Sequence, residues 1–329
     1  MSKSFNEARE KFEAIFSATM SAEDAKDYLV SLYTKGETSE EIAAAVEVMR
    51  KYSIKLDIEE ELKDKLIDVV GTGGDKSGSF NISSTVSLLL ASSGSYVAKH
   101  GNRAITSNSG SADMLEALGI NLNLDPKQQA QMLQECGFAF LFAINHHPAM
   151  KHIMPIRKSL SHRTIFNILG PLTNPAGVRK YLIGVFSHEF LNRIVTALSL
   201  LDTKSAIAVS SRDGMDEISI CDITYAVMLK EGKTTEFIID PQEHGFKLAP
   251  AEAILGADAA HNAGITMDIF NGKEKGAKRD IILLNSAMAF VVDGKARDMQ
   301  EGIEIAKDAI DSKKCVTHLK KIIEISNKF

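Results

Sequence analysis

From about residue 65 onward, short β-rich runs alternate with helical patterns. The β-rich runs are "KLIDVV", "SYVAKH", "FAFLFA", "YLIGVF" and "SAIAVSS", and patterns such as "SADMLEALG" and "HEFLNRIVTALSLL" separate them. This alternation is typical of a mainly parallel sheet with helices on its faces, because parallel neighbours are joined through helical crossovers. We therefore predict an α/β fold, in which ligands bind beyond the carboxyl ends of the strands.

The first sixty or so residues, by contrast, look helical throughout. Ser21 is a candidate N-cap and Gly36 a candidate helix stop, and Thr38 with Glu41 has the spacing of a capping box. We therefore expect a small, mainly helical domain at residues 1–65. Beside it we expect a large α/β domain with a mostly parallel central sheet flanked by helices.

The alternation is interrupted at about residues 160–180. The stretch "RKSLSHRTIFNILGPLTNPAG" contains two glycines and two prolines, which indicate an excursion or hinge segment that joins the helical domain. The large domain is then predicted to consist of residues 66–159 and 181–329. Within it, "YAVMLKEGKTTEFIID" predicts an antiparallel hairpin that turns at Glu231 and Gly232, and the C-terminal tail reads mostly as helix.

Charge and cysteine content narrow the possible partners. The 329 residues carry 38 basic and 43 acidic side chains, and this net charge of -5 disfavours a general nucleic-acid surface. Cys136, Cys221 and Cys315 form no C-x-x-C pair, so neither a zinc knuckle nor a disulfide framework is indicated. The sequence shows no signal peptide and no apolar run long enough to span a bilayer. We expect a cytoplasmic protein without a nucleic-acid or membrane partner.

The stretch "DVVGTGGDKSGSFNISST", residues 68–85, follows an apolar strand with four glycines among eight residues. Two familiar phosphate-binding patterns do not match here. In G-x-G-x-x-G the third glycine is replaced by Lys76, and in G-x-x-x-x-G-K-S the glycine before the lysine is replaced by Asp75. What remains is a glycine turn entering a helix N-terminus, whose free N–H groups suit phosphate oxygens. On the simplest alternative, the glycines only form a tight turn and Asn81 only caps the helix.

A second turn of the same kind follows the next strand. The stretch "VAKHGNRAITSNSGSAD" closes an apolar strand with glycine, adds Lys99, His100, Asn102 and Arg103, and enters a helix at Ser111. Because carboxyl ends of neighbouring parallel strands meet at one edge of the sheet, we expect the two turns to line one cleft. The alternative for Lys99 is a solvated surface lysine.

Seven motifs along nearly the whole chain resemble the anthranilate phosphoribosyltransferase family. They are "GTGGD", "NISS", "KHGNR", "SGSADMLEALG", "HPAMKHIMPIRKSL", "RTIFNILGPLTNPA" and "DGMDEIS", in the family's order. The resemblance implies that the amino group of anthranilate attacks the anomeric carbon of phosphoribosyl pyrophosphate (PRPP) and expels pyrophosphate. Since an aromatic amine is already uncharged near neutral pH, the main task is to stabilise an oxocarbenium-like ribose and the departing pyrophosphate.

The resemblance also implies the site residues on the phosphate side. Magnesium is expected as the cofactor, with Ser83, Asp216 and Glu217 as its ligands, because Mg²⁺ binds through one or two carboxylates plus substrate phosphates. Where this chain has Ser84 the family usually has threonine, which keeps the hydroxyl. The residues expected to bind PRPP are Gly71, Gly74, Asp75, Ser79, Asn81, Ile82, Ser83, Ser84, Lys99, Gly101, Asn102, Arg103, Ser107 and Ser111.

For anthranilate the resemblance implies a second set of residues. Arg157 suits the substrate carboxylate through its rigid donor fork, although a surface ion pair is the plainer alternative. The histidines at 146, 147 and 152 would not share one helical face, so we expect no zinc site there. The full set implied for anthranilate is Gly71, His100, Asn102, His147, Arg157 and Gly170.

The chain departs from the family's pattern at Ser161, where a glycine is usual. If that glycine adopts a left-handed conformation, Ser161 carries strain or shifts the end of the preceding helix, beside Arg157.

Two other functions stay open on the sequence. A pyrimidine nucleoside phosphorylase would use inorganic phosphate without a metal, and a non-catalytic relative would bind nucleic acid through a basic groove. The family resemblance further implies a homodimer formed through the helical domain, and glycine and proline in the joining segments suggest hinge closure on substrate.

Overall fold

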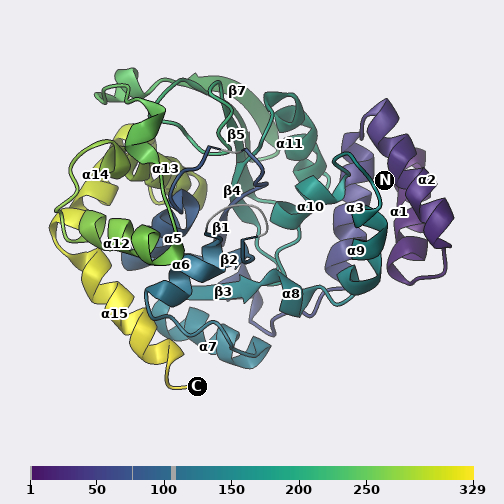
Figure 1. The fold of residues 1–329 in the computed structure, drawn as a ribbon, viewed down its shortest axis with the longest axis horizontal. Coiled ribbons are helices and arrows are strands. Elements are labelled where there is room, and N and C mark those ends of the chain that lie inside the picture. Colours follow the sequence, from purple (N-terminus) through teal and green to yellow (C-terminus); the bar gives the residue numbers. More distant parts are fainter. Residues whose placement is uncertain (1, 76, 105–108) are drawn as a thin grey trace.

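The computed structural model describes residues 2–75, 77–104 and 109–329. It consists of a small helical unit at the N-terminus and a larger α/β unit built on a seven-stranded sheet (Figure 1). Four of the six strand pairings are parallel and the last two are antiparallel. The predicted fold class, a helical domain beside a mostly parallel α/β domain, is therefore confirmed.

The helical unit contains α1 (Lys3–Phe16), α2 (Ala22–Lys35) and α3 (Ser39–Lys51), and the short α4 (Glu60–Lys63) follows in the connection to the sheet. Ser21 Oγ accepts the N–H of Asp24 at 3.1 Å, Gly36 ends α2 at φ +81°, and the Thr38–Glu41 capping box forms in full. These local predictions are confirmed because each depends on hydrogen bonds within one turn of helix.

The sheet runs in the order β3-β2-β1-β4-β5-β6-β7. The turn between the last two strands places Glu231 at φ +51° and Gly232 at φ +72°, as a tight hairpin requires, and confirms the predicted turn. The strand bounds are β1 (Leu66–Gly71), β2 (Tyr96–Gly101), β3 (Phe138–Phe142), β4 (Lys180–Gly184), β5 (Ser205–Ser211), β6 (Thr224–Lys230) and β7 (Lys233–Ile239).

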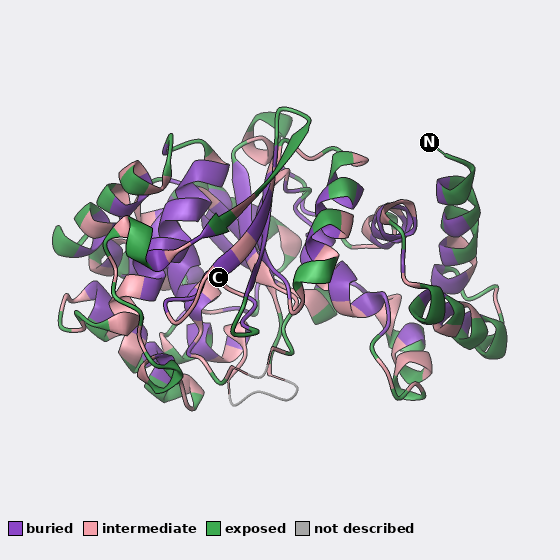
Figure 2. Ribbon diagram, turned by 90° about the horizontal axis from the view of Figure 1, so that it is seen from above, coloured by how far each residue is buried: buried purple, intermediate pink, exposed green. Residues whose placement is uncertain are grey.

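β1 to β5 are mostly buried, whereas the edge strand β7 is mostly exposed (Figure 2). α5 and α13 pack on one another and on the central strands, whereas α11 lies between the sheet and α3 of the helical unit (Figure 1). No helix of the described part is long and apolar enough to cross a membrane. The bounds are α5 (Ile82–Ser92), α6 (Ser111–Ala117), α7 (Pro126–Cys136), η1 (His188–Phe190), α11 (Leu191–Ser199), η2 (Pro241–His244), η3 (Ala251–Ile254), α12 (Ala259–Phe270), α13 (Ala277–Asp293), α14 (Met299–Asp311) and α15 (Lys314–Ser326).

The chain returns to the helical unit between β3 and β4, through α8 (Ala143–His146), α9 (Met150–Lys158) and α10 (Phe166–Leu172). α9 packs on α1 and α2, and α10 packs on α3. α9 therefore contacts the helical unit before the predicted excursion at 160–180, because the packing of α9 on α1 and α2 leaves no local signal in the sequence. The division into domains at these residue numbers stays a prediction.

Candidate active site

The connection from β1 to α5, residues 72–81, lies at the carboxyl edge of the sheet. Gly73, Gly74 and Gly78 have φ angles of +70°, +79° and +68°, which residues with a Cβ rarely adopt. The turn leads into the N-terminus of α5, where the first backbone N–H groups have no helical partners. The geometry that suits phosphate oxygens is thus present.

The loop after β5 packs directly against this turn. A Cβ on Gly71 would come within 2.5 Å of Asp216 Oδ2, and a Cβ on Gly184 would overlap the carbonyl oxygen of Asp216. The Asp216 carboxylate accepts the N–H of Gly73 at 2.7 Å, and the Asp216 N–H donates to Asp75 Oδ2 at 3.4 Å. Bare glycine backbone therefore lets two segments 143 residues apart meet at one place.

Lys99 lies at the end of β2, fully buried behind the turn. Its side chain is 1% exposed, and Nζ donates to the carbonyl of Val69 at 2.7 Å and to Ser83 Oγ at 3.3 Å. Burial lowers the pKa of Lys99, while the negative charges of Asp68 and Glu217 oppose that shift. The alternative of a solvated surface lysine is therefore wrong for this structure.

Acidic side chains gather around Lys99. Burial, followed by repulsion from Asp75, raises the pKa of Asp216 to about 7. Burial and the charge of Asp216 raise the pKa of Glu217 well above its usual value, and burial raises that of Asp68 to about 7, with Lys99 opposing both shifts. The carboxylates exceed the positive charge available to them, which is the electrostatic setting of a site for a hard cation.

The remaining residues expected on the phosphate side line the same edge, except Ser107, which lies outside the described residues. The hydroxyl of Ser84 is buried and has no hydrogen-bond partner in the described part of the chain. Ser79 forms an isolated bridge with Leu255, and Ile82 is buried at the start of α5. Gly101 closes β2, with the ring of Phe140 and Cβ of Ser111 filling the space of its missing side chain.

Asn81 connects the glycine turn with two other segments. Its Oδ1 accepts from Asn262 Nδ2 at 2.9 Å and from Ser109 Oγ at 3.1 Å, and its Nδ2 donates to the carbonyl of Ser109. Asn262 is itself buried and accepts the N–H of Ala257 at 2.8 Å. Asn81 precedes α5 but makes no side-chain cap, so its side chain ties loops together rather than serving the helix.

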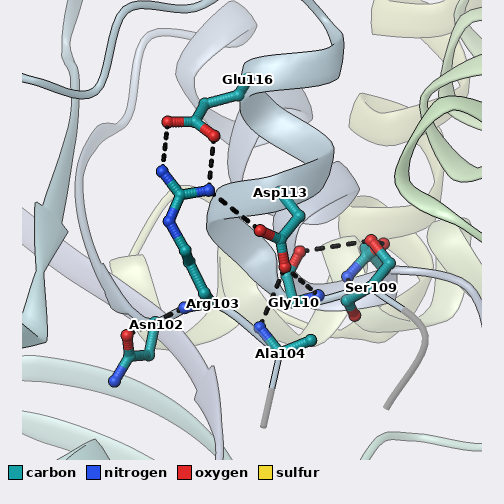
Figure 3. A network of polar contacts seen from close by, with 8 residues as sticks. Asn102, Arg103, Ala104, Ser109, Gly110, Asp113 and Glu116 are labelled. Atoms are coloured by element: carbon teal, nitrogen blue, oxygen red, sulfur yellow. Dashed lines mark hydrogen bonds and ion pairs between the residues drawn. The ribbon is translucent and has the colours of Figure 1, made fainter.

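Arg103 holds the second turn against α6 (Figure 3). Its guanidinium donates to both carboxylate oxygens of Glu116, at 2.6 and 2.7 Å, and to Asp113 Oδ1 at 3.0 Å. Asp113 Oδ2 also accepts the N–H groups of Ala104 and Gly110, each at 2.9 Å. Asn102 is exposed beside it, with its Oδ1 accepting the N–H of Arg103. Arg103 thus binds the carboxylates of α6 and fixes the second turn to that helix.

His100 and His147 form a buried pair next to α10, with ring centroids 5.2 Å apart. His100 Nδ1 contacts the carbonyl of Gly170 at 3.1 Å, and the Nε2 atoms of both rings are buried without a partner among the described residues. Burial lowers the pKa of His100 to about 3 and that of His147 to about 4. Both buried rings are therefore neutral near pH 7.

Arg157 lies half-buried on α9, with its guanidinium over the ring of Phe166 at 5.5 Å. Burial lowers its pKa, and in the described chain no carboxylate pairs with it, so the surface ion pair considered above does not form. Ser161 is not among the described residues with positive φ, and α9 ends at Lys158 before a right-handed Ser159. The strain expected at Ser161 is therefore absent from the described backbone.

Sequence reasoning missed two buried polar residues of this site. Asp68 lies inside the apolar run "LIDVV". A charged residue in a strand that is otherwise apolar could have marked it as a functional candidate, because such residues are rarely buried unless they are paired. Its carboxylate accepts from Asn174 Nδ2 at 2.8 Å and from the N–H of His100 at 3.3 Å. Asn262 carried no local signal, because its role depends on a contact with Asn81, 181 residues away.

Comparison with known proteins gives the class and then the family. The profile described as "Glycosyl transferase family, helical bundle domain" matches residues 3–53, and "Glycosyl transferase family, a/b domain" matches residues 63–316. With the site described above, these matches define a two-part glycosyl transferase. An anthranilate phosphoribosyltransferase of Xanthobacter autotrophicus is 43% identical over 323 residues, covering 98% of this chain and 92% of that protein. The chain belongs to the anthranilate phosphoribosyltransferase family.

Solved structures agree with this membership. The anthranilate phosphoribosyltransferase of Thermus thermophilus superposes with a TM-score of 0.91 at 37% identity, covering 98% of this chain and 95% of that chain. The Saccharomyces cerevisiae enzyme, determined in complex with PRPP and Mg, superposes with a TM-score of 0.88 at 27% identity, covering 99% and 94%.

Proposed function

We propose that this chain transfers the phosphoribosyl group of PRPP to the amino group of anthranilate, giving N-(5-phosphoribosyl)anthranilate and pyrophosphate. The carrying observation is the convergence of the glycine turn, Lys99 and the acidic pair Asp216 and Glu217 at the carboxyl edge of the sheet. The names of the relatives at about 40% identity support the same substrates.

The residues of the turn act on the pyrophosphate and the ribose. N–H groups of the glycine turn and of the first turn of α5 bind the phosphate oxygens, and Lys99 supplies positive charge behind them. As the bond from the anomeric carbon to pyrophosphate breaks and pyrophosphate leaves with the bonding electron pair, the amine nitrogen of anthranilate forms the new bond and then loses one proton to water. The chain holds both substrates in line for this exchange, which provides much of the rate enhancement.

Magnesium fits the acidic side of the site. Ser83, Asp216 and Glu217 would hold it, and Mg²⁺ would neutralise charge on the departing pyrophosphate. The excess of buried carboxylate, with pKa values raised at Asp216 and Glu217, supports a hard cation there. No three metal-binding side chains in the described ranges form a complete cage, a pattern that suits an ion completed by phosphate and water.

For anthranilate we propose the pocket bordered by His100, His147, Asn102, Arg157 and Gly170. The unpaired guanidinium of Arg157 suits the carboxylate, and the free Nε2 atoms of the two histidines suit polar atoms of the ring substituents.

We also propose a cytoplasmic homodimer formed through the helical unit. Tyr33 and Ile54 are 50% and 46% exposed there, apolar area that a second copy would cover. The three cysteines are free thiols, as expected in a reducing compartment. In sedimentation, the wild type should run as a dimer and Ile54→Glu should shift it toward monomer; a monomeric wild type would contradict the dimer.

The function is tested by following anthranilate fluorescence with PRPP, with and without Mg²⁺. We expect the emission to fall only when both are present, and Asp216→Asn to slow the reaction at least about 100-fold. The exposed Asp268→Asn is the matched control and should retain activity. Turnover of a pyrimidine nucleoside with phosphate and no metal would instead favour the phosphorylase, and salt-sensitive nucleic-acid binding without turnover would favour the non-catalytic relative.

A further inference from the structure

The segment between α9 and α10 contacts the helical unit and the glycine turn through two consecutive residues. The ring of His162 stacks on Tyr33 of α2, with centroids 3.9 Å apart and planes 15° apart. The guanidinium of Arg163 lies 3.7 Å from the ring centroid of Phe186, and its Nη2 donates to the carbonyl oxygen of Gly74 at 2.9 Å. One short stretch is therefore attached to both parts of the molecule.

Phe186 is itself tied to the other end of the same turn. Its N–H donates to Thr72 Oγ1 at 3.1 Å, and the N–H of Thr72 donates to the carbonyl of Gly184 at 2.9 Å. A continuous series of contacts therefore links Thr72 to Phe186, Phe186 to the guanidinium of Arg163, and Arg163 to Gly74. These contacts hold both ends of residues 72–74, the first part of the glycine turn.

These contacts matter because the glycine backbone of the turn can adopt many conformations in their absence. Gly73 and Gly74 both have positive φ and no side chain that could pack, so ordering them costs more conformational entropy than ordering other residues. A charged donor on the Gly74 carbonyl is stronger than a neutral one. Stacking on Phe186 also fixes the plane of the guanidinium, a geometry that lysine does not reproduce.

Arg163 does not form the surface ion pair that is common for an exposed arginine. Its side chain is exposed, yet in the described ranges no carboxylate lies within salt-bridge distance, and its hydrogen bond goes to the main chain of the site. A Cβ on Gly74 would come within 3.3 Å of Nη2, so the arginine also occupies the space beside that glycine.

We propose that Arg163 is a positioning residue that fixes the glycine turn for PRPP, and that His162 links this position to the helical unit. The proposal rests on the proposed function, since it assigns the residue to the PRPP half of that site. It predicts an effect on PRPP that is separate from any effect on anthranilate, whose candidate residues Arg163 does not contact.

The test compares Arg163→Lys and Phe186→Leu with the wild type and with Arg297→Lys, an exposed arginine just before α14 that pairs with Glu301. We expect the KM for PRPP, and its Kd by calorimetry with Mg²⁺, to rise about 10-fold in Arg163→Lys and about 3-fold in Phe186→Leu. The KM for anthranilate and the melting temperature should stay near wild type, and Arg297→Lys should be unchanged throughout.

Phe186→Leu separates positioning from direct charge, because it removes no charge. Wild-type PRPP affinity in Arg163→Lys or in Phe186→Leu would overturn the proposal, as would an equal rise of both KM values. A second measurement addresses His162: His162→Ala should also raise the KM for PRPP, and the combined His162→Ala, Arg163→Lys variant should be less than additive. If the wild type itself showed no turnover, the proposed function would fail instead.

Discussion

The buried pair of His100 and His147 makes the stability of this protein depend on pH in a calculable way. Burial is the main cause of both lowered pKa values, about 3 and about 4, and each ring is further disfavoured as a cation by a neighbouring histidine. In the unfolded chain a histidine titrates near 6.5. Between pH 6.5 and about 4 the unfolded chain therefore binds more protons than the native protein.

This difference in bound protons fixes whether the protein gains or loses stability as the pH falls. The stabilising contribution of each neutral histidine is fully present above pH 6.5 and is lost as the pH falls toward the folded pKa. From pH 8 to pH 5 the loss is about 2 kcal/mol for each ring, or about 4 kcal/mol for the pair. Asp68 and Asp216, with pKa values raised to about 7, gain protons in the same range and act in the opposite direction.

Comparison with a variant isolates the histidines from these carboxylates. Urea unfolding followed by circular dichroism at pH 8, 7, 6 and 5 should show that His100→Asn, His147→Gln loses about 4 kcal/mol less than the wild type over this range. The exposed His261→Asn is the control and should follow the wild type. Parallel curves for the double variant and the wild type would refute the argument that both rings are held neutral by burial.

Three further substitutions test the packing of the site. Lys99→Met should lower the free energy of unfolding by about 2 kcal/mol and remove most PRPP affinity in calorimetry, because two charge-assisted hydrogen bonds disappear; unchanged affinity would contradict this. Gly184→Ala should lower the free energy of unfolding in urea by more than about 2 kcal/mol, because the added Cβ would overlap the Asp216 carbonyl. Its control is Gly264→Ala on α12, where no atom lies within 4 Å of the added Cβ; the free energy of unfolding should stay unchanged or rise by up to about 1 kcal/mol. Asn262→Ala should raise the KM for PRPP several-fold with the KM for anthranilate unchanged, and equal changes in both would argue against its contact with Asn81 as the cause.

The sequence by itself determined the features that depend on neighbours along the chain. The Thr38–Glu41 capping box, the turn at Glu231 and Gly232, and the alternation of strands and helices were all readable, because each is governed by periodicity and by hydrogen bonds within a few residues. The motifs also identified the family.

Only the tertiary structure decided which groups meet. The contact of Asp216 with Gly73, the burial of Lys99 and the support of Asn81 by Asn262 join segments far apart in sequence. The attachment of Arg163 to Gly74 likewise depends on the path of the chain between α9 and α10. Such contacts arise from the packing of whole elements, and burial then sets the pKa values, so neither is encoded in local spacing.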